Sequence, residues 1–582
     1  MATQTEQSTD RLDTLLSFTA ELLASYDKLE MSRQRYLLTI LLPAFVFFLV
    51  TIAGAILLTV PLLVRLPLPM LGLLLLGAAV VYPKIYISQR RIEIENQFHL
   101  VMTHMTVLSL TNIDRMEVFR TLAGEEEYGV LAEEMGHVVH LVDTWNQSLD
   151  EACRRRAKEV PSDALGDFFE RLGYIMGAGQ EMKDFMINEQ EIMMEQYSTV
   201  YEGSLDNIEV MKDLYMSMIL SMTFALVFAI VLPILSGINP TVTVVGVIMM
   251  FMFVQLGFFF IIRTMAPYDP VWYFPEARFV ENRKLWGSLA FGGIGSMLLV
   301  FFMGFGFVGI GPGVDGLLFF IDTVPLPVYI GFPVAPLLVT GIVLRNEEQT
   351  IHSRDDQFPN FIRSLGSAEH AKQATTSVVL ETLRTNDFGA LTPNINRLYR
   401  RLGMRLDPNQ AWSEFSIECR SYLIQKFSEM FLVGRQMGGN TKLLGEVISS
   451  NMNQVNQLRT QRKQATTTLI GLLYGITAAA TFAFFIGLEV VNILAGFSTE
   501  LEIQSDQFDI GQIIHPEPYN IPLIEYLLLL VILFNAALSS VMIRTIDGGN
   551  KATAYIHFVM MTWLGCLVAI FTREVVSVVL AI

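Results

Sequence analysis

The stretch GGNTKLLGEVISSNMNQVNQLRTQRKQATTTLIGLL (residues 438–473) decides the fold. Gly438, Gly439 and Asn440 tolerate the left-handed backbone conformation in which helices end, and Thr441 favours the start of a new helix. Apolar residues then recur at helical spacing, at Leu444, Val447, Ile448, Val455 and Leu458. The pattern continues into an apolar segment near Thr467. It predicts one helix that begins in a polar module and ends within a membrane.

The same polar module extends over residues 345–465, between long apolar runs. Its middle predicts one long amphipathic helix, with apolar residues at Trp412, Phe415, Cys419, Leu423, Phe427 and Phe431. A second polar segment occupies residues 88–212, where Gly177 and Gly179 are expected to break the helices as Gly438 and Gly439 do.

The composition places the chain among multi-pass membrane proteins. Of its 582 residues, 52% are hydrophobic, and they gather in blocks. A hydrocarbon core of about 30 Å requires about 20 residues of helix, and nine segments come close to that length. These segments are Leu38–Val60, Pro67–Ile87, Leu214–Leu235, Val242–Ile262, Trp286–Gly306, Val328–Leu344, Leu469–Leu488, Pro522–Met542 and Ala554–Phe571. The predicted fold is therefore an all-α polytopic membrane protein with about nine spans and two cytoplasmic helical modules.

Basic residues set the expected orientation. With a cytoplasmic N-terminus and nine spans, 38 of the 40 Lys and Arg lie on the cytoplasmic side, which leaves Arg65 and Arg573 outside. The stretch 489–520 has six acidic and no basic residues, as expected for an external loop. Both modules are then cytoplasmic and the C-terminus is external.

These patterns divide the chain into six parts. They are an amphipathic cytoplasmic segment (1–36), a first pair of spans (37–87), the first module (88–212), four spans (213–344), the second module (345–465) and three spans (466–582). The amphipathic segment suits a helix on the membrane or on the protein itself, and equally a helix that docks a partner. The run Gly292-Gly293-Ile294-Gly295-Ser296 permits close helix packing, either within a monomer or in a homodimer.

The two polar segments share dipeptides in the same order. Gln97-Phe98, Asn146-Gln147, Cys153-Arg154 and Met176-Gly177 recur later in the chain, at a nearly constant offset, as Gln357-Phe358, Asn409-Gln410, Cys419-Arg420 and Met437-Gly438. Because both segments are expected on the same side of the membrane, the order indicates a parallel internal repeat.

Two helical modules of this kind, each flanked by spans, resemble the type II secretion F family of platform proteins. Within that family, the chain is most similar to the platform of the archaellum, the archaeal flagellum (the FlaJ/ArlJ type). The resemblance implies a membrane base without enzyme activity, on which a cytoplasmic hexameric ATPase and its ATP-binding regulator act while archaellin or pilin subunits enter a filament. The platform of an archaeal type IV adhesion pilus is the alternative. The net charge of -17, with few lysines, resembles proteins of salt-loving (halophilic) archaea.

The motifs of other function classes are missing from the sequence. No phosphate-binding loop occurs, since Gly438-Gly439-Asn440-Thr441-Lys442 lacks the required spacing. The expected spans carry almost no ionisable residue at mid-depth, which disfavours an ion-coupled transporter. Their polar members Gln255, Asn535 and His557 are expected to hydrogen-bond between helices. No cofactor, metal or nucleic acid is expected.

Charge distinguishes the two modules. Residues 88–212 contain 24 acidic and 11 basic residues, whereas residues 345–465 contain 12 acidic and 16 basic ones. The basic residues proposed to dock a partner are Arg397, Arg400, Arg401, Arg405 and Arg435. Pairing with the acidic first module and contact with anionic membrane lipid remain open for the same residues.

Overall fold

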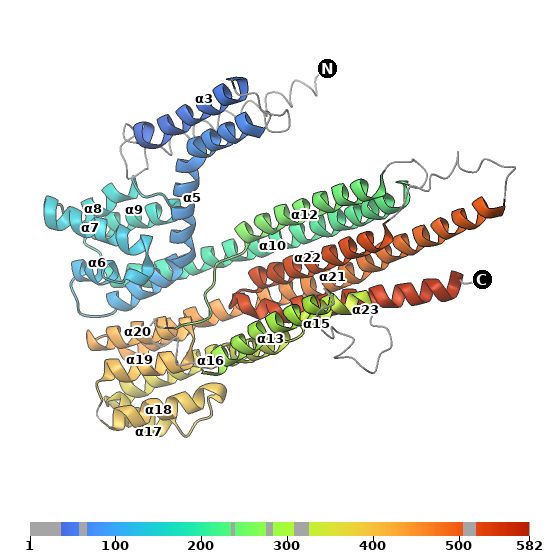
Figure 1. Ribbon diagram of the computed structural model, residues 1–582. Coiled ribbons are helices and arrows are strands. Elements are labelled where there is room, and N and C mark those ends of the chain that lie inside the picture. The colour runs from blue at the N-terminus through green and yellow to red at the C-terminus, as the bar shows by residue number, and fades with distance from the viewer. Residues whose placement is uncertain are drawn as a thin grey trace, which may run out of the picture. The chain divides into compact units, whose positions relative to one another are not determined.

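The computed structural model describes residues 36–57, 67–233, 239–274, 283–307, 325–404, 406–504 and 520–580. The predicted amphipathic segment 1–36 lies almost wholly outside this range. The described residues form helices and one isolated bridge between Trp272 and Ser421 (Figure 1). Two compact units divide the chain: Met1–Met194 with Val433–Asn440, and Glu195–Leu432 with Thr441–Ile582.

The first module begins and ends in long helices that continue toward apolar segments. Its elements are α5 (Pro67–Ser109), α6 (Arg115–Ala123), the 3-10 turn η2 (Glu126–Tyr128), α7 (Val130–Trp145), α8 (Leu149–Ala157), α9 (Asp163–Gly177) and α10 (Met182–Val231). Before it come η1 (Leu37–Leu41) and α3 (Leu42–Leu57).

The second module has the same order of elements. They are α16 (Leu337–Lys372), α17 (Thr376–Leu383), the 3-10 turn η4 (Gly389–Leu391), α18 (Thr392–Gly403), α19 (Pro408–Cys419), α20 (Tyr422–Gln436) and α21 (Thr441–Gln504). The offset from the start of α9 at Asp163 to that of α20 at Tyr422 equals the offset from the start of α10 at Met182 to that of α21 at Thr441. The predicted repeat is therefore present in the structure as a repeated succession of helices.

The helix boundaries correct three of the equivalences drawn from dipeptides. Asn146 ends α7 in a left-handed conformation, whereas Asn409 lies in the first turn of α19, so these two do not correspond. Gly179 and Gly438 correspond, because both take positive φ values, +75° and +81°, between equivalent helices. Gly177, which the dipeptides pair with Gly438, is instead the last residue of α9. Cys153 lies within α8 whereas Cys419 ends α19, so this pair does not correspond either.

The predicted helix through Trp412 and Phe431 is two helices, and the prediction of one was wrong. Arg420 takes φ +58° and ends α19, and α20 begins at Tyr422. The Arg420 carbonyl accepts a bond from Tyr273 N at 2.9 Å, so the break is set by a distant segment. The six apolar side chains nevertheless lie in the core, as expected.

The remaining helices are α12 (Pro240–Met265), α13 (Arg283–Phe307), α15 (Leu326–Val334), α22 (Ile521–Asp547), the 3-10 turn η6 (Lys551–Thr553) and α23 (Ala554–Leu580). By length and composition, six helices in the described part of the chain can cross a membrane, or seven if the bent pair α15 and α16 is one span. The apolar helix Leu37–Ala53 is shorter. The predicted number of nine spans is therefore not confirmed.

The membrane bundle of the second unit has one apolar core, to which α10, α12, α21, α22 and α23 contribute. Within it Gln255 Nε2 donates to Asn535 Oδ1 at 2.6 Å, and Asn535 Nδ2 donates to Thr477 Oγ1 at 3.1 Å. His557 Nδ1 lies 3.1 Å from the Tyr474 hydroxyl. These contacts confirm the predicted hydrogen bonds between spans. The glycine run packs within the chain, because a side chain at Gly292 would collide with Thr340 of α16.

Candidate functional site

The helix α21 joins the second module to the membrane bundle. It runs unbroken from Thr441 to Gln504, 64 residues or about 95 Å at the usual rise per residue. Its first part packs against α16 so closely that a side chain at Gly445 would collide with the Ile362 carbonyl. Its later part lies beside α22 and α23 (Figure 1). The predicted continuous helix is confirmed, and Leu444, Ile448, Val455 and Leu458 are buried while Val447 is half-buried.

Arg459 of α21 lies where the module meets the bundle, and it binds two carboxylates. Its Nε and Nη2 donate to Asp269 at 2.7 and 2.6 Å, and its Nη1 donates to Asp355 Oδ2 at 2.9 Å. The Arg459 side chain is 8% exposed, and those of Asp269 and Asp355 are 10% and 1% exposed. One guanidinium therefore ties α21 to α16 and to the segment that follows α12.

The electrostatics of this junction depend on the pairing. Burial alone disfavours a charged Asp269, but the charge and hydrogen bonds of Arg459 outweigh that cost and lower the Asp269 pKa. At Asp355 burial wins instead: it raises the pKa of this fully enclosed carboxyl to about 7, although Arg459 and Ser421 oppose the shift. A buried ion pair that loses one partner leaves an uncompensated charge, which costs about 3–5 kcal/mol. Sliding of α21 past its neighbours is therefore opposed, whereas movement of the joined parts together is not.

The segment after α12 also binds the second module through its backbone. Tyr422 N donates to the Val271 carbonyl at 3.1 Å, opposite the bond from Tyr273 N to Arg420. Ser421 lies between these bonds. Its hydroxyl donates to Asp355 and accepts from Ile424 N at 3.1 Å, which caps α20. The α19–α20 break, the segment 271–273 and Asp355 are thus one connected structure.

Two further arginines connect α21, α22 and α16 beside the second module. Arg462 of α21 donates to the carbonyls of Thr545 and Ile546, in the last turn of α22. Arg544 of α22 binds Glu348 of α16, and it also pairs with Asp547 at 2.7 Å. Arginine suits such positions because several donors in a fixed plane can satisfy carbonyls and carboxylates together. Together with Arg459, these two arginines join α16, α21 and α22.

The arginines predicted to dock a partner lie elsewhere, and the structure brings two of them together. Arg397 Nε donates to Glu418 Oε2 at 2.8 Å, and Arg401 binds the other oxygen of the same carboxylate. Burial opposes the charge on Glu418, but hydrogen bonds from Arg401 and Arg397 outweigh it and lower the Glu418 pKa. Arg400 is exposed, and its Nε donates to the Asn396 carbonyl of the same helix at 3.4 Å.

The other two predicted residues are not part of this group. Arg435 lies in the last turn of α20, and Arg405 lies outside the described residues. The predicted helix-breaking glycines do lie at helix ends, since Gly177 closes α9 and Gly438 and Gly439 separate α20 from α21. Partner docking by the arginines stays a prediction.

Sequence reasoning missed Arg459, Arg462 and Arg544. The sequence feature that could have identified them is their position just outside the apolar segments, where an arginine can bind the ends of neighbouring membrane helices. The partners of Arg459, Asp269 and Asp355, are 190 and 104 residues away from it in the sequence, so no local pattern could have predicted these pairs. Within the described ranges, no group of three or more His, Cys, Asp and Glu side chains is arranged to hold a metal ion.

Comparison with known proteins gives consistent matches. The family described as Type II secretion system (T2SS), protein F matches residues 101–231. Flagella accessory protein J of Methanocaldococcus jannaschii is 32% identical over 550 residues, which cover 94% of this chain and 96% of that protein. Flagella accessory protein J of Methanococcus voltae is 32% identical over 510 residues, covering 87% and 90%. No solved structure matches the chain.

Replacing Arg459 by alanine leaves Asp269 and Asp355 buried without their cation. We expect Arg459→Ala to lower the free energy of unfolding by about 3–5 kcal/mol. The free energy of unfolding of Arg459→Lys should lie between those of Arg459→Ala and the natural protein, because a lysine ammonium keeps the charge but cannot bind two carboxylates with the planar geometry of a guanidinium. Thermal unfolding of the protein in detergent measures both. Arg120→Ala is the matched control, since the exposed Arg120 also binds two carboxylates, Glu117 and Asp143. Equal unfolding temperatures for Arg459→Ala and Arg120→Ala would contradict the assignment.

Proposed function

Because the chain belongs to the family of Flagella accessory protein J, a family of membrane platform proteins of the archaellum, we propose how this platform carries force. The observation that carries the proposal is the continuous helix α21, which starts in the second module and is held by Arg459 and Arg462 where it enters the bundle. A cytoplasmic hexameric ATPase moves the second module, and α21 conveys that movement into the spans. The output is assembly of archaellin subunits into the filament, and its rotation.

The junction favours transmission as one body. Two helices of the module, α16 and α21, continue into the membrane bundle, and the α19–α20 junction binds segment 271–273, which follows the membrane helix α12. A push on α19 or α20 therefore reaches α12 through Val271 and Tyr273, and α21 through Asp355 and Arg459. The ATPase and its ATP-binding regulator supply the energy in this scheme.

The orientation follows the distribution of basic residues. The N-terminus and both modules face the cytoplasm, and the C-terminus is external. We propose the same six parts of the chain as the sequence predicts, with the first module at residues 88–212 and the second at residues 345–465. In this orientation the acidic first module and the basic second module both face the side where the ATPase acts.

Labelling of introduced cysteines tests the orientation. The natural Cys153, Cys419 and Cys566 are buried, so they give a low background. Cysteines at the exposed positions Glu151 and Asn386 should react with an impermeant maleimide only after permeabilisation. A cysteine at Ser505, in the acidic stretch outside the described residues, should react in intact cells. Labelling of Glu151→Cys or Asn386→Cys in intact cells would contradict the proposed orientation.

Arg400 provides the sharpest test of ATPase docking, because Arg397 and Arg401 already bind Glu418. Arg400→Glu should reduce co-purification of the ATPase about five- to tenfold at native salt, since it reverses an exposed charge at a contact. The unfolding temperature should not change. Arg363→Glu is the control, because Arg363 is an exposed residue of α16 and the substitution changes the net charge equally. Equal ATPase recovery with both variants would rule out docking at Arg400.

A further inference from the structure

The internal repeat puts the α8–α9 junction of the first module in correspondence with the α19–α20 junction of the second. Ser162 directly precedes α9 and Ser421 directly precedes α20, so the two serines hold the same position in the repeat. Each hydroxyl accepts a bond from the backbone N–H three residues later, from Leu165 at 3.5 Å and from Ile424 at 3.1 Å. Both serines are fully buried. The equivalence therefore extends to the side chain that starts each helix.

In the second module this junction holds an extended segment. Residues 271–273 lie against it in an antiparallel bridge, with Tyr422 N donating to the Val271 carbonyl and Tyr273 N donating to the Arg420 carbonyl. Tyr422 is the first residue of α20, and the N–H groups of a first helical turn have no partner inside the helix. The extended segment satisfies one of them.

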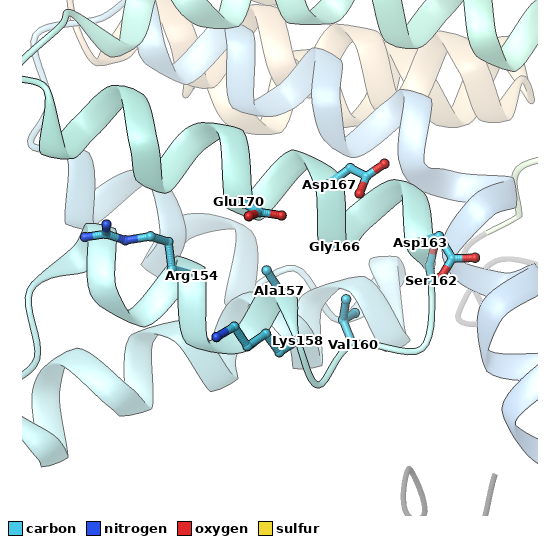
Figure 2. A pocket seen from close by; sticks show the side chains of 9 residues that line it. All are labelled: Arg154, Ala157, Lys158, Val160, Ser162, Asp163, Gly166, Asp167 and Glu170. Atoms are coloured by element: carbon cyan, nitrogen blue, oxygen red, sulfur yellow. The ribbon is translucent and has the colours of Figure 1, made fainter. Parts of the chain in front are cut away.

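The corresponding place in the first module is a hollow of about 380 Å³. Figure 2 shows Ala157, the last residue of α8, and the following Lys158 on one side of it, and Asp167 and Glu170 of α9 on the other. Asp163 corresponds to Tyr422, and in the described part of the chain its N–H donates to no backbone carbonyl. The link between α8 and α9 (158–162) is longer than the link between α19 and α20 (420–421). Val160 of the longer link lines the hollow.

The lining has a defined charge. Asp163 pairs with Arg91 at 3.2 Å, and Arg154 pairs with Asp150. Asp167 and Glu170 are exposed, lie one turn apart, and form no ion pair among the residues that the structure describes. Lys158, which also lines the hollow and is exposed, forms no ion pair among the described residues either. These three groups leave a net charge of one carboxylate, which a basic side chain of a bound segment could match.

We propose that this hollow binds an extended, basic segment of a cytoplasmic protein partner. The backbone of the segment bonds the start of α9 at Asp163 N, as residues 271–273 bond the start of α20. A Lys or Arg side chain of the segment pairs with Asp167 and Glu170. Chain pairing supplies the position and the carboxylates supply the selectivity. The proposal rests on the proposed orientation, in which the first module is cytoplasmic, and does not depend on ATPase docking at Arg400.

Photo-crosslinking in cells tests this site. A p-benzoylphenylalanine residue is introduced at Ala157, an uncharged and half-buried residue that lines the hollow, and the crosslinked peptide is identified by mass spectrometry. The expected product is a Lys- or Arg-containing segment of one cytoplasmic protein. Asp167→Lys with Glu170→Lys should lower its yield roughly tenfold or more, since two favourable pairs become repulsive. Asp167→Asn with Glu170→Gln should lower the yield less.

The control variant is Glu191→Lys with Glu195→Lys, two exposed acidic residues of α10, one turn apart and outside the hollow. It should leave the yield unchanged, and all variants should keep the unfolding temperature of the natural protein. A crosslink to lipid, to residues 1–36, to a second copy of the chain, or to a segment without a basic residue would overturn the proposal. An equal loss of yield in the control variant would do the same.

Discussion

The buried guanidinium of Arg459 is the interaction on which the second unit depends. It lies between Asp269 and Asp355, which belong to different parts of the chain, and water reaches only 8% of its side chain. A charge in such a place is tolerated because the neighbouring carboxylates are paired with it. The same bonds fix the position of the long helix α21 against α16 and against the segment after α12. The module and the bundle thereby become one mechanical part.

The two modules share one backbone plan but differ in charge and in what their junctions bind. Both use the same succession of helices and the same capping serine, so the backbone plan is shared. At the junction after α19, the second module binds a segment of its own chain and gains Asp355 as a partner for Ser421. At the junction after α8, the first module keeps a hollow with an acidic wall. We propose that the second module transmits movement and that the first binds a basic partner.

Much of the fold could be predicted from the sequence, because its signals are local. The glycines before Thr441 and the apolar spacing of Leu444 to Leu458 were sufficient to predict α21, and the two polar segments indicated the repeat. The break at Arg420 could not be predicted in this way, because the bonds that set it come from Tyr273 and Asp355. The pairing of Arg397 and Arg401 with Glu418 could not be predicted either, because the arginines lie on α18 and Glu418 lies on α19. The site residues missed were those whose partners are distant in the sequence.

Transmission through α21 can be tested by interrupting the helix beyond its anchored part. Thr468 is exposed, lies between Arg462 and the apolar span, and donates its hydroxyl to the Gln464 carbonyl at 3.4 Å. A proline there removes a backbone bond and kinks the helix at a cost of about 3 kcal/mol, without touching Arg459. The measurement is the number of archaella per cell, by electron microscopy, for Thr468→Pro and Thr468→Ala. We expect normal filament numbers for Thr468→Ala, and for Thr468→Pro a protein that inserts and binds the ATPase but assembles no filaments. Normal filament numbers in the Thr468→Pro strain would contradict it.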